Sequence, residues 1–439
     1  MTAIRKIHGR EVLDSRGRPT VEVEIHTEDG AVGIALAPSG ASTGSSEVLE
    51  LRDSDTKRYD GLGVLQAVAN VNSFIAPALV GKDSADQRLC DSIMNELDDS
   101  PQKSGLGGNA TIAVSLALGH AAAASLRIPL YEHLHRVIQQ GSSALGFDPA
   151  LFPAPMLPLP ETNMISGGLH AGGNLDFQDV LIAPVGAPDY PSCLEWIVRV
   201  YNRLGQLLRD RGFEGYLVGD EGGYGPRLTS NRDAVALVTQ AIEAAGLIPG
   251  SDVVITLDVA STHFYHDGKY HLNAEQGRVL SSSEMIDTLE SWVNEFPIIS
   301  IEDGLAEDDW EGWQELQSRL GDRILLVGDD LFTTNPERVR RGIELKAANS
   351  VLVKVNQIGT LTETIETMAL GRQAGFSLVV SARSGETEDS TLADLAVAAA
   401  GEQIKVGSIV RSERLAKYNR LLQISEKVTG FQNSRERHV

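Results

Sequence analysis

The stretch DVVITLD, residues 252–258, is the first of a series of short apolar segments that together decide the fold. Each segment ends in or near a polar side chain and is followed by a longer stretch with helical character. The other members are FPIISIE (296–302), RILLVGD (323–329), SVLVK (350–354), FSLVVS (376–381) and QIKV (403–406). Because apolar strands that alternate with helices form parallel sheets covered on both faces, an α/β fold is predicted. The number of repeats favours a closed βα barrel, with an open doubly wound sheet as the alternative.

The chain before this series has a different character. Five prolines crowd into FDPALFPAPMLPLP (147–160), where no helix can persist. Upstream, PTVEVEIH (19–26) alternates with strand period and AVGIALA (31–37) follows a turn, which predicts an antiparallel pair. The alanine-rich segment 109–126 predicts a buried helix. The predicted organisation is an α+β capping domain over 1–140, a proline-rich linker over 141–160, a barrel over 161–430 and a polar tail over 431–439.

Composition excludes several classes of protein. Hydrophobic residues make up 42% and charged residues 22% of the 439 positions, which is typical of a globular protein. Sixty acidic side chains against 38 basic ones give a formal net charge of −22, which disfavours binding to nucleic acid or to anionic membranes. No stretch is expected to approach a membrane span of roughly 20 apolar residues. With only Cys90 and Cys193, no disulfide framework is expected and a cytoplasmic location is predicted.

Charged side chains stand at the ends of several predicted barrel strands. They are Asp258, Glu302, Asp329, Lys354 and, within the QIKV segment, Lys405. Any one of them has about an even chance of being a structural residue at the start of a loop. Three carboxylates on successive strands, with two lysines beyond, favour a functional site. The carboxyl ends of barrel strands open onto one face, and unpaired charges there are costly.

Three carboxylate oxygens with open positions suit Mg²⁺, which keeps waters and accepts substrate oxygens. A lysine opposite such an ion can be held neutral by nearby positive charge and act as a base. The combination predicts removal of a proton next to a substrate carboxylate, with Mg²⁺ stabilising the enediolate that results.

Four further polar stretches fit this chemistry, although each also has a structural interpretation. Glu221 lies in the tight turn GDEGGYGP, and His170 and Gln178–Asp179 flank a glycine-rich loop. The segment APSGASTG (37–44) is small and rich in backbone donors, which suits a lid or a phosphate cradle, and alone it is weak evidence. Arg383 and Ser384 follow a strand directly and could grip a phosphoryl or carboxylate group.

Taken together, these motifs resemble those of the enolase family from residue 3 to about residue 427. The matching segments, in family order, are VLDSRGRPTVEVE, APSGASTG, VGDEGG, SIEDGLAEDDW, VGDDLFTTNP, LVKVNQIGTLTE, RSGETED and RSERLAKYN. The resemblance implies a small α+β capping domain followed by a modified, enolase-type βα barrel. It also implies a homodimer or higher homo-oligomer, a small anionic phospho- or phosphono-glycerate as substrate, and two Mg²⁺ ions, the second arriving with the substrate.

The resemblance also implies a role for each matching position. Lys354 would be the base that takes the C2 proton, and Lys405 would lie beside the substrate carboxylate. Glu221 would be the acid that helps hydroxide leave C3. Asp258, Glu302 and Asp329 would hold the first Mg²⁺, and Ser42 would bind the second. The implied substrate contacts are His170, Gln178, Ser381, Arg383 and Ser384, together with position 382.

Four positions depart from the family pattern. The family has Gln-Glu where this chain has Gln178-Asp179, so a second catalytic carboxylate is one methylene shorter. It has Ser-His-Arg-Ser where this chain has Ala382, so a substrate-contacting imidazole is missing. Two further departures, Gly304 in place of proline and Arg18 in place of asparagine, carry less information about function. Two changes within one pocket are unlike drift, since buried polar contacts with substrate are expensive to lose.

Three functions follow as hypotheses. The favoured one is a specialised enolase-type dehydratase that converts 2-phosphonoformylglycerate to carboxyphosphonoenolpyruvate in phosphinate antibiotic biosynthesis, since Ala382 leaves room for an added carboxylate. The alternative is ordinary enolase activity between 2-phosphoglycerate and phosphoenolpyruvate. A catalytically silent binding protein is the third, and the intact lysines and carboxylates argue against it.

Overall fold

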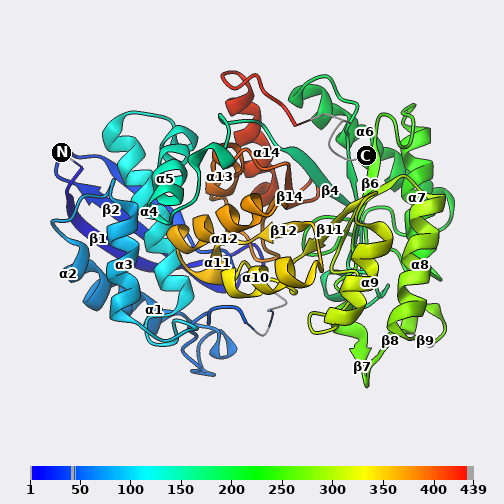
Figure 1. The fold of residues 1–439 in the computed structure, drawn as a ribbon, viewed down its shortest axis with the longest axis horizontal. Helices are drawn as coiled ribbons and strands as arrows, with labels where there is room; N and C mark the ends of the chain where they lie inside the picture. The colour runs from blue at the N-terminus through cyan, green and yellow to red at the C-terminus, as the bar shows by residue number, and fades with distance from the viewer. Residues whose placement is uncertain (1, 41–43, 45, 433–439) are drawn as a thin grey trace.

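The computed structural model describes residues 2–40, 44 and 46–432. It has a capping domain and a barrel lying side by side (Figure 1). In the capping domain, strands β1 (Ile4–Leu13), β2 (Pro19–Thr27) and β3 (Val32–Leu36) form an antiparallel sheet in that order. The predicted strand pair is therefore confirmed. The helices of this domain are α1 (Leu65–Asn70), α2 (Ala76–Leu79), α3 (Gln87–Leu97), α4 (Gly108–Leu126) and α5 (Leu130–Ala144), with a π-helical turn at Val71–Ile75 and a 3-10 turn at Tyr59–Gly61.

Helix α4 is the buried helix that the sequence predicts, and it packs against β2 and β3. Its alanines let the backbones approach closely: a Cβ added to Gly33 on β3 would come within 2.1 Å of the Ala121 amide nitrogen. By length and composition alone, α4 could cross a membrane, so the expectation that no stretch approaches a span was wrong. Because 78% of its apolar window is buried inside the protein, α4 is the core helix of this domain.

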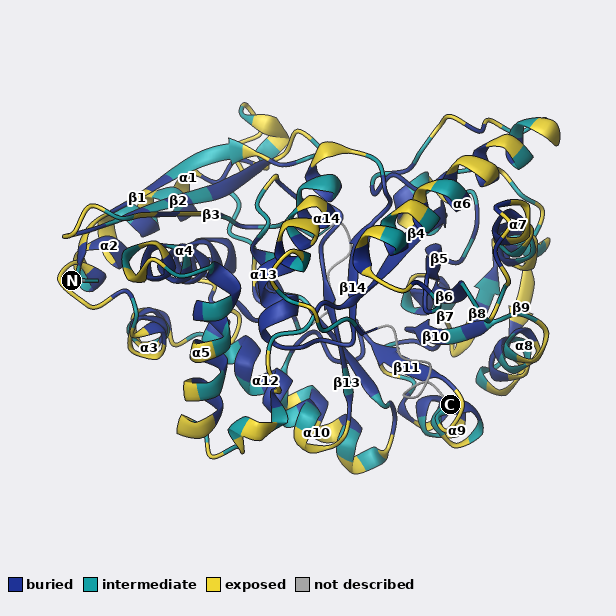
Figure 2. Cartoon of the chain, turned by 90° about the horizontal axis from the view of Figure 1, so that it is seen from above, coloured by how far each residue is buried: buried dark blue, intermediate teal, exposed yellow. Residues whose placement is uncertain are grey.

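Eight strands close the barrel in the order β10-β11-β12-β13-β14-β4-β5-β6, and they form its dark, buried centre in Figure 2. Their bounds are β4 (Leu159–Ser166), β5 (Asp179–Ala183), β6 (Val254–Asp258), β10 (Ile298–Glu302), β11 (Leu325–Gly328), β12 (Ser350–Val353), β13 (Ser377–Ser381) and β14 (Gln403–Gly407). Each apolar segment singled out in the sequence contains one of these strands, and the closed barrel confirms the predicted fold class over the open sheet.

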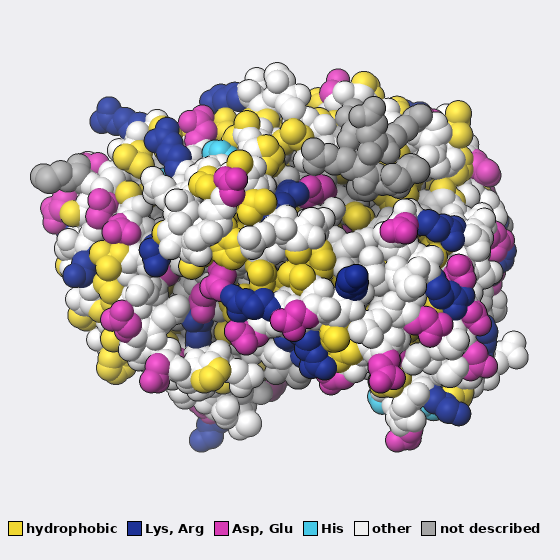
Figure 3. Space-filling view, viewed as in Figure 1, with side chains coloured by type: hydrophobic (Ala, Val, Ile, Leu, Met, Phe, Trp, Pro, Cys, Tyr) yellow, Lys and Arg dark blue, Asp and Glu magenta, His cyan; other side chains and the backbone are white. Residues whose placement is uncertain are grey.

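Helices surround the barrel; most are exposed on their outer faces (Figure 2), and two that contact the capping domain are almost entirely buried. The surrounding helices are α6 (Tyr190–Asp210), α7 (Asn231–Ala244), α8 (Ser282–Glu295), α9 (Trp310–Leu320), α10 (Pro336–Leu345), α11 (Val355–Ile358), α12 (Leu361–Gln373), α13 (Thr391–Ala398) and α14 (Ser412–Ser425). A small antiparallel sheet, β7 (Tyr265–His266), β8 (Lys269–Leu272) and β9 (Arg278–Leu280), lies outside the barrel. The remaining short 3-10 helices are Pro149–Leu151, Gly168–Ala171, Ser261–Phe264 and Asn273–Glu275. Acidic and basic side chains are interspersed on the face shown in Figure 3.

The barrel differs from an all-parallel one at a single strand. β5 runs antiparallel to both β4 and β6, because the connection after β4 holds only the short 3-10 helix Gly168–Ala171 and no crossover helix. The start of β5 consequently lies where its neighbours end, and Asp179 is the register partner of Asp258. This reversal brings the Gln178–Asp179 pair to the same barrel end as the other charged residues.

The two domains meet where α11, α12 and α13 of the barrel pack against α3, α4 and α5 of the capping domain. Part of this contact is polar: the buried Asp91 carboxylate on α3 accepts hydrogen bonds from the Thr362 backbone amide at 3.0 Å and its hydroxyl at 2.6 Å. The contact covers the barrel end at which the charged side chains gather. The predicted linker boundaries themselves stay predictions, with α5 ending at Ala144 and β4 starting at Leu159.

Candidate active site

Five charged side chains meet at the carboxyl ends of the barrel strands. Lys405 on β14 donates to Asp258 Oδ2 at 2.6 Å and to Glu302 Oε2 at 2.7 Å, on the opposite side of the barrel. Lys354, directly after β12, donates to Asp329, directly after β11. Lys354 is nearly buried and the other four are buried, so the strand ends converge as their positions in the repeats require.

Mutual repulsion among the three carboxylates favours a divalent cation. Burial raises the pKa of Glu302 well above its usual range, and the charges of Asp258 and Asp329 raise it further. Asp258 also accepts a hydrogen bond from Gln178 Nε2 at 3.0 Å. The carboxylate oxygens of the three residues are hard ligands of the kind that Mg²⁺ prefers. The excess of negative charge and the oxygen donors fit the ion that the sequence predicts. Ser42, predicted for a second ion, lies outside the described residues.

Two other groups bring possible ligand atoms within 4.8 Å of one another among the described residues: Asp303 with Asp329 and Asp330, and His170 with Asp179 and Glu221. Asp258, Glu302 and Asp329 do not form a third such group there, since the lysines lie between them. Asp303 accepts the backbone amides of Asp329 at 3.0 Å and Asp330 at 2.7 Å, so its carboxylate shapes the turn after β11.

Burial and neighbouring charges shift the pKa of Lys354 in opposite directions. Burial disfavours its charge, but Asp329 outweighs burial, and the pKa of Lys354 is raised above its usual value. Arg383 and Lys405 act in the opposite direction. A cation that engages Asp329 would remove the main influence that keeps Lys354 protonated, which is what a lysine base requires.

The second cluster joins His170 to two carboxylates. His170 Nδ1 lies 2.9 Å from Asp179 Oδ2, and its Nε2 lies 3.8 Å from Glu221 Oε1. Burial lowers the pKa of His170, but Glu221 and Asp179 raise it more, to about 9. The pKa of Glu221 is lowered to about 2, because His170, Arg414 and the two lysines outweigh burial. The proton that this pair holds near neutral pH therefore resides on the imidazole.

Asp179 does not border the cavity, contrary to what its predicted catalytic role implies. Its second oxygen accepts from Ser166 Oγ at 2.6 Å, so both oxygens are engaged behind His170. Its side chain is one methylene shorter than the glutamate of the family pattern, which keeps it close to its own strand. In this structure Asp179 orients the imidazole, and direct contact with substrate stays a prediction.

The loop that carries Arg383 and Ser384 follows β13. Arg383 is buried between Glu47, with Nη1 to Oε2 at 3.0 Å, and Asn356 Oδ1 at 3.0 Å. Arg414 donates to the carbonyls of Arg383 and Ser384, each at 2.6 Å, which holds the backbone of the loop. The guanidinium is thus preorganised on a fixed loop.

A small cavity of about 20 Å³ lies among the side chains of this site. Its lining consists of His170, Gln178, Glu221, Lys354, Ser381, Ala382, Arg383, Ser384 and Lys405. Every predicted catalytic or substrate-binding residue except Asp179 is in this set, whereas no unpredicted residue is.

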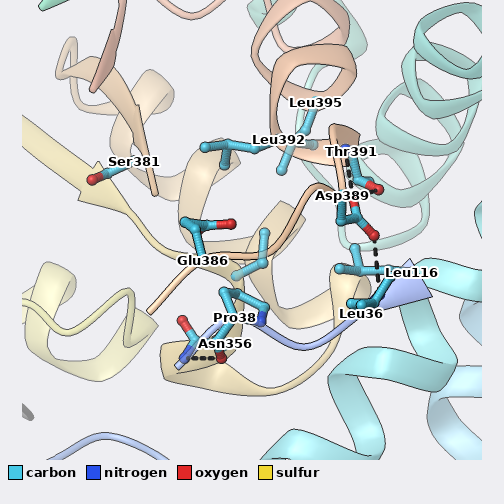
Figure 4. Close-up of a pocket in the computed structure, with 11 residues that line it drawn as sticks. Leu36, Pro38, Leu116, Asn356, Ser381, Glu386, Asp389, Thr391, Leu392 and Leu395 are labelled. Carbon is cyan, nitrogen blue, oxygen red and sulfur yellow. Dashed lines mark hydrogen bonds between the residues drawn. The ribbon is translucent and has the colours of Figure 1, made fainter. Parts of the chain in front are cut away.

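A second cavity, of about 30 Å³, lies between the two domains and shares Ser381 with the first (Figure 4). Its walls are mainly apolar, with Leu36 and Pro38 from the capping domain facing Leu392 and Leu395 of the barrel. Asn356 Nδ2 donates to the Pro38 carbonyl at 3.2 Å along one edge (Figure 4). Ser381 therefore lies between the active-site cavity and this second cavity.

Sequence reasoning missed the residues that support the loop. Arg16 Nη1 donates to Ser384 Oγ at 3.3 Å, and Gln357 Nε2 donates to Asp329 Oδ1 at 2.9 Å and to Glu47 Oε1 at 3.2 Å. Arg16, Glu47, Gln357 and Arg414 lie far apart in sequence. Except for Glu47, they lie within the segments that carry the family resemblance, which was the available signal.

Comparison with protein-family models matches both parts of the chain. The enolase N-terminal domain matches residues 4–134, and the enolase C-terminal TIM barrel domain matches residues 154–436. Enolases are Mg²⁺-dependent hydro-lyases that act on small phosphorylated acids, in agreement with the oxygen donors, lysines and arginine gathered here. The chain belongs to the enolase family.

Proposed function

We propose that this dehydratase acts on 2-phosphonoformylglycerate and forms carboxyphosphonoenolpyruvate, a step of phosphinate antibiotic biosynthesis. The observation that carries the proposal is Ala382, which borders the cavity between Ser381 and Arg383 where the family has an imidazole. A methyl group is smaller than an imidazole and would leave room beside Arg383 for an added carboxylate on the bound substrate. The neighbouring interdomain cavity at Ser381 allows that wall to adjust.

In the proposed reaction, each of these residues would have a separate role. Arg383 and Ser384 would bind the phosphorus group, and Lys405 would hold the substrate carboxylate. Lys354 would remove the C2 proton, because it borders the cavity and holds the position that the base occupies in the family. Bound at Asp258, Glu302 and Asp329, Mg²⁺ would supply stabilisation of the negative charge that develops on the substrate.

Loss of the C3 hydroxyl needs a proton from the other side of the cavity. The His170–Glu221 pair is placed for this, since the imidazole carries the proton and both side chains border the cavity. Asn163 Nδ2 donates to Glu221 Oε2 at 3.1 Å and fixes the carboxylate. Asp179 keeps the ring in place from behind.

Three further features belong to the proposal. A second Mg²⁺ would arrive with the substrate at Ser42. The protein would be a homodimer or higher homo-oligomer in the cytoplasm, in keeping with two buried, free cysteines. Neither nucleic acid nor membrane would be a partner.

The test follows enolpyruvyl ultraviolet absorbance after 2-phosphonoformylglycerate is added to the protein with Mg²⁺ or with excess EDTA. We expect absorbance to rise only with Mg²⁺. No rise with this substrate, but a rise with 2-phosphoglycerate, would support ordinary enolase activity instead. No rise with either substrate would support a binding protein.

A further inference from the structure

A buried carboxylate that the proposed reaction does not use lies inside the barrel, near the active site. Glu161 on β4 is 4% exposed and is the register partner of Lys405 on β14. Its neighbour across the interior is Thr256 on β6, two residues before Asp258. Glu161 therefore lies level with Lys405, in the layer of the barrel interior that borders the charged strand ends.

Polar atoms without partners gather in this layer. Glu161 Oε1, Thr256 Oγ1 and both polar atoms of the Gln403 amide are buried and have no hydrogen-bond partner among the described residues. Gln403 lies two residues before Lys405 on β14. Native proteins rarely leave buried polar groups unpaired, so these atoms mark a polar layer that the described side chains do not satisfy by themselves.

The opposite side of the same layer is apolar. Val327, Leu352 and Val379, on β11, β12 and β13, pack together with Leu325. An apolar side chain at position 161 would continue this packing, whereas a buried carboxylate without a full set of partners costs stability. Glu161 is therefore not there to stabilise the barrel.

The charged neighbour of Glu161 is Lys405 on the adjacent strand. Its two ion-pair partners, Asp258 and Glu302, are both carboxylates of the Mg²⁺ site. When an ion draws on those oxygens, the ammonium needs another negative neighbour in the buried interior. Burial raises the pKa of Glu161 to about 7 while the charge of Lys405 lowers it, so the two groups already interact.

We propose that Glu161 is a positioning residue for Lys405. Its carboxylate supports the ammonium from the neighbouring strand and frees Asp258 and Glu302 for Mg²⁺. This inference rests on the family-level Mg²⁺ site and deepens the proposed function. It does not depend on which glycerate is the substrate.

The experiment measures the melting temperature of the full chain across a Mg²⁺ titration, without substrate, for wild type, Glu161→Gln and Glu161→Leu. A ligand that binds only the folded state raises its melting temperature without saturating, so affinity is reported by the Mg²⁺ concentration that produces a fixed rise in melting temperature, here called the Mg²⁺ midpoint. Without Glu161, Lys405 competes harder for Asp258 and Glu302. We expect both variants to need about 10-fold more Mg²⁺, the lower range for residues that support metal ligands.

Glu402→Gln is the matched control. Glu402 is a buried glutamate directly before β14, but it is paired with Arg372 and accepts the Leu378 amide at 2.9 Å. Its loss should lower the melting temperature and leave the Mg²⁺ midpoint unchanged, whereas Glu161→Leu without Mg²⁺ should melt at or above the wild-type temperature.

An unchanged Mg²⁺ midpoint in both Glu161 variants would overturn the proposal. A fall in the melting temperature of Glu161→Leu together with a wild-type midpoint would show a purely structural role and also overturn it. Both readouts stand even if neither glycerate is turned over, so failure of this inference is distinguishable from failure of the proposed function.

Discussion

The two sides of the active-site cavity are built differently. The reaction side consists of Lys354, Lys405 and the metal carboxylates, each fixed at the end of a barrel strand and paired with an opposite charge. The substituent side is the loop of residues 381–384, held through backbone carbonyls by Arg414. A strand end cannot move without disturbing the barrel, whereas a side chain such as Ala382, on a loop after the strand, can be exchanged without changing the barrel. The difference favours the proposal that the family reaction is retained while the group accepted on the substrate has changed.

The largest effect is expected on the reaction side. Lys354→Ala should lower exchange of the substrate C2 proton by about 10²–10⁴-fold or more, because it removes the general base. The measurement is deuterium incorporation at C2 by NMR. Circular dichroism and Mg²⁺ binding should be unchanged, and exchange near the wild-type rate would remove Lys354 from this role.

A change on the substituent side should alter selectivity. Ala382→His combined with Asp179→Glu should shift the ratio of kcat/KM toward 2-phosphoglycerate by roughly 10- to 100-fold. A hydrogen bond to a charged phosphoryl group contributes about 1.5–3 kcal/mol, and the same ring would collide with an added carboxylate. Ala382→His alone separates the two changes. If the ratio stayed constant in both variants, position 382 would not select the substrate.

The next largest effect is expected on Mg²⁺ binding, at the predicted metal carboxylates. Asp329→Asn should weaken Mg²⁺ binding by about tenfold or more, since a neutral amide replaces one of three anionic oxygens. Isothermal titration with Mg²⁺ measures this directly. Asp303→Asn is a comparison variant, because Asp303 is occupied by backbone amides. Equal affinity in Asp329→Asn and wild type would take Asp329 out of the ligand set.

The smallest effect concerns pH. Asp179 raises the pKa of His170, so Asp179→Asn should lower it from about 9 and move the alkaline decline of kcat to lower pH. A raised histidine pKa stabilises the folded state below the ordinary value of about 6.5, and this stabilisation disappears as pH rises through 9. NMR titration of the imidazole checks the shift, and an unchanged pKa would show that Asp179 does not control His170.

The barrel and the charged strand ends could be predicted because apolar segments with charged last residues carry both signals locally. The reversal of β5 could not, since its direction depends on the short connection after β4 and not on the strand itself. The engagement of Asp179 behind His170 follows from that reversal. Arg16, Glu47 and Gln357 acquire their roles through contacts between domains, which no local pattern shows. Glu161 was missed because a single glutamate directly after a proline-rich stretch gives no sign that it faces the barrel interior.

The central claim is that the substituent side of the cavity was altered for a larger phosphorus group. The most direct test is the ratio of kcat/KM for 2-phosphonoformylglycerate to that for 2-phosphoglycerate, measured on the wild-type protein with saturating Mg²⁺. We predict a ratio well above one. A wild-type protein that turns over 2-phosphoglycerate with the efficiency of an ordinary enolase, and 2-phosphonoformylglycerate poorly, would contradict the account.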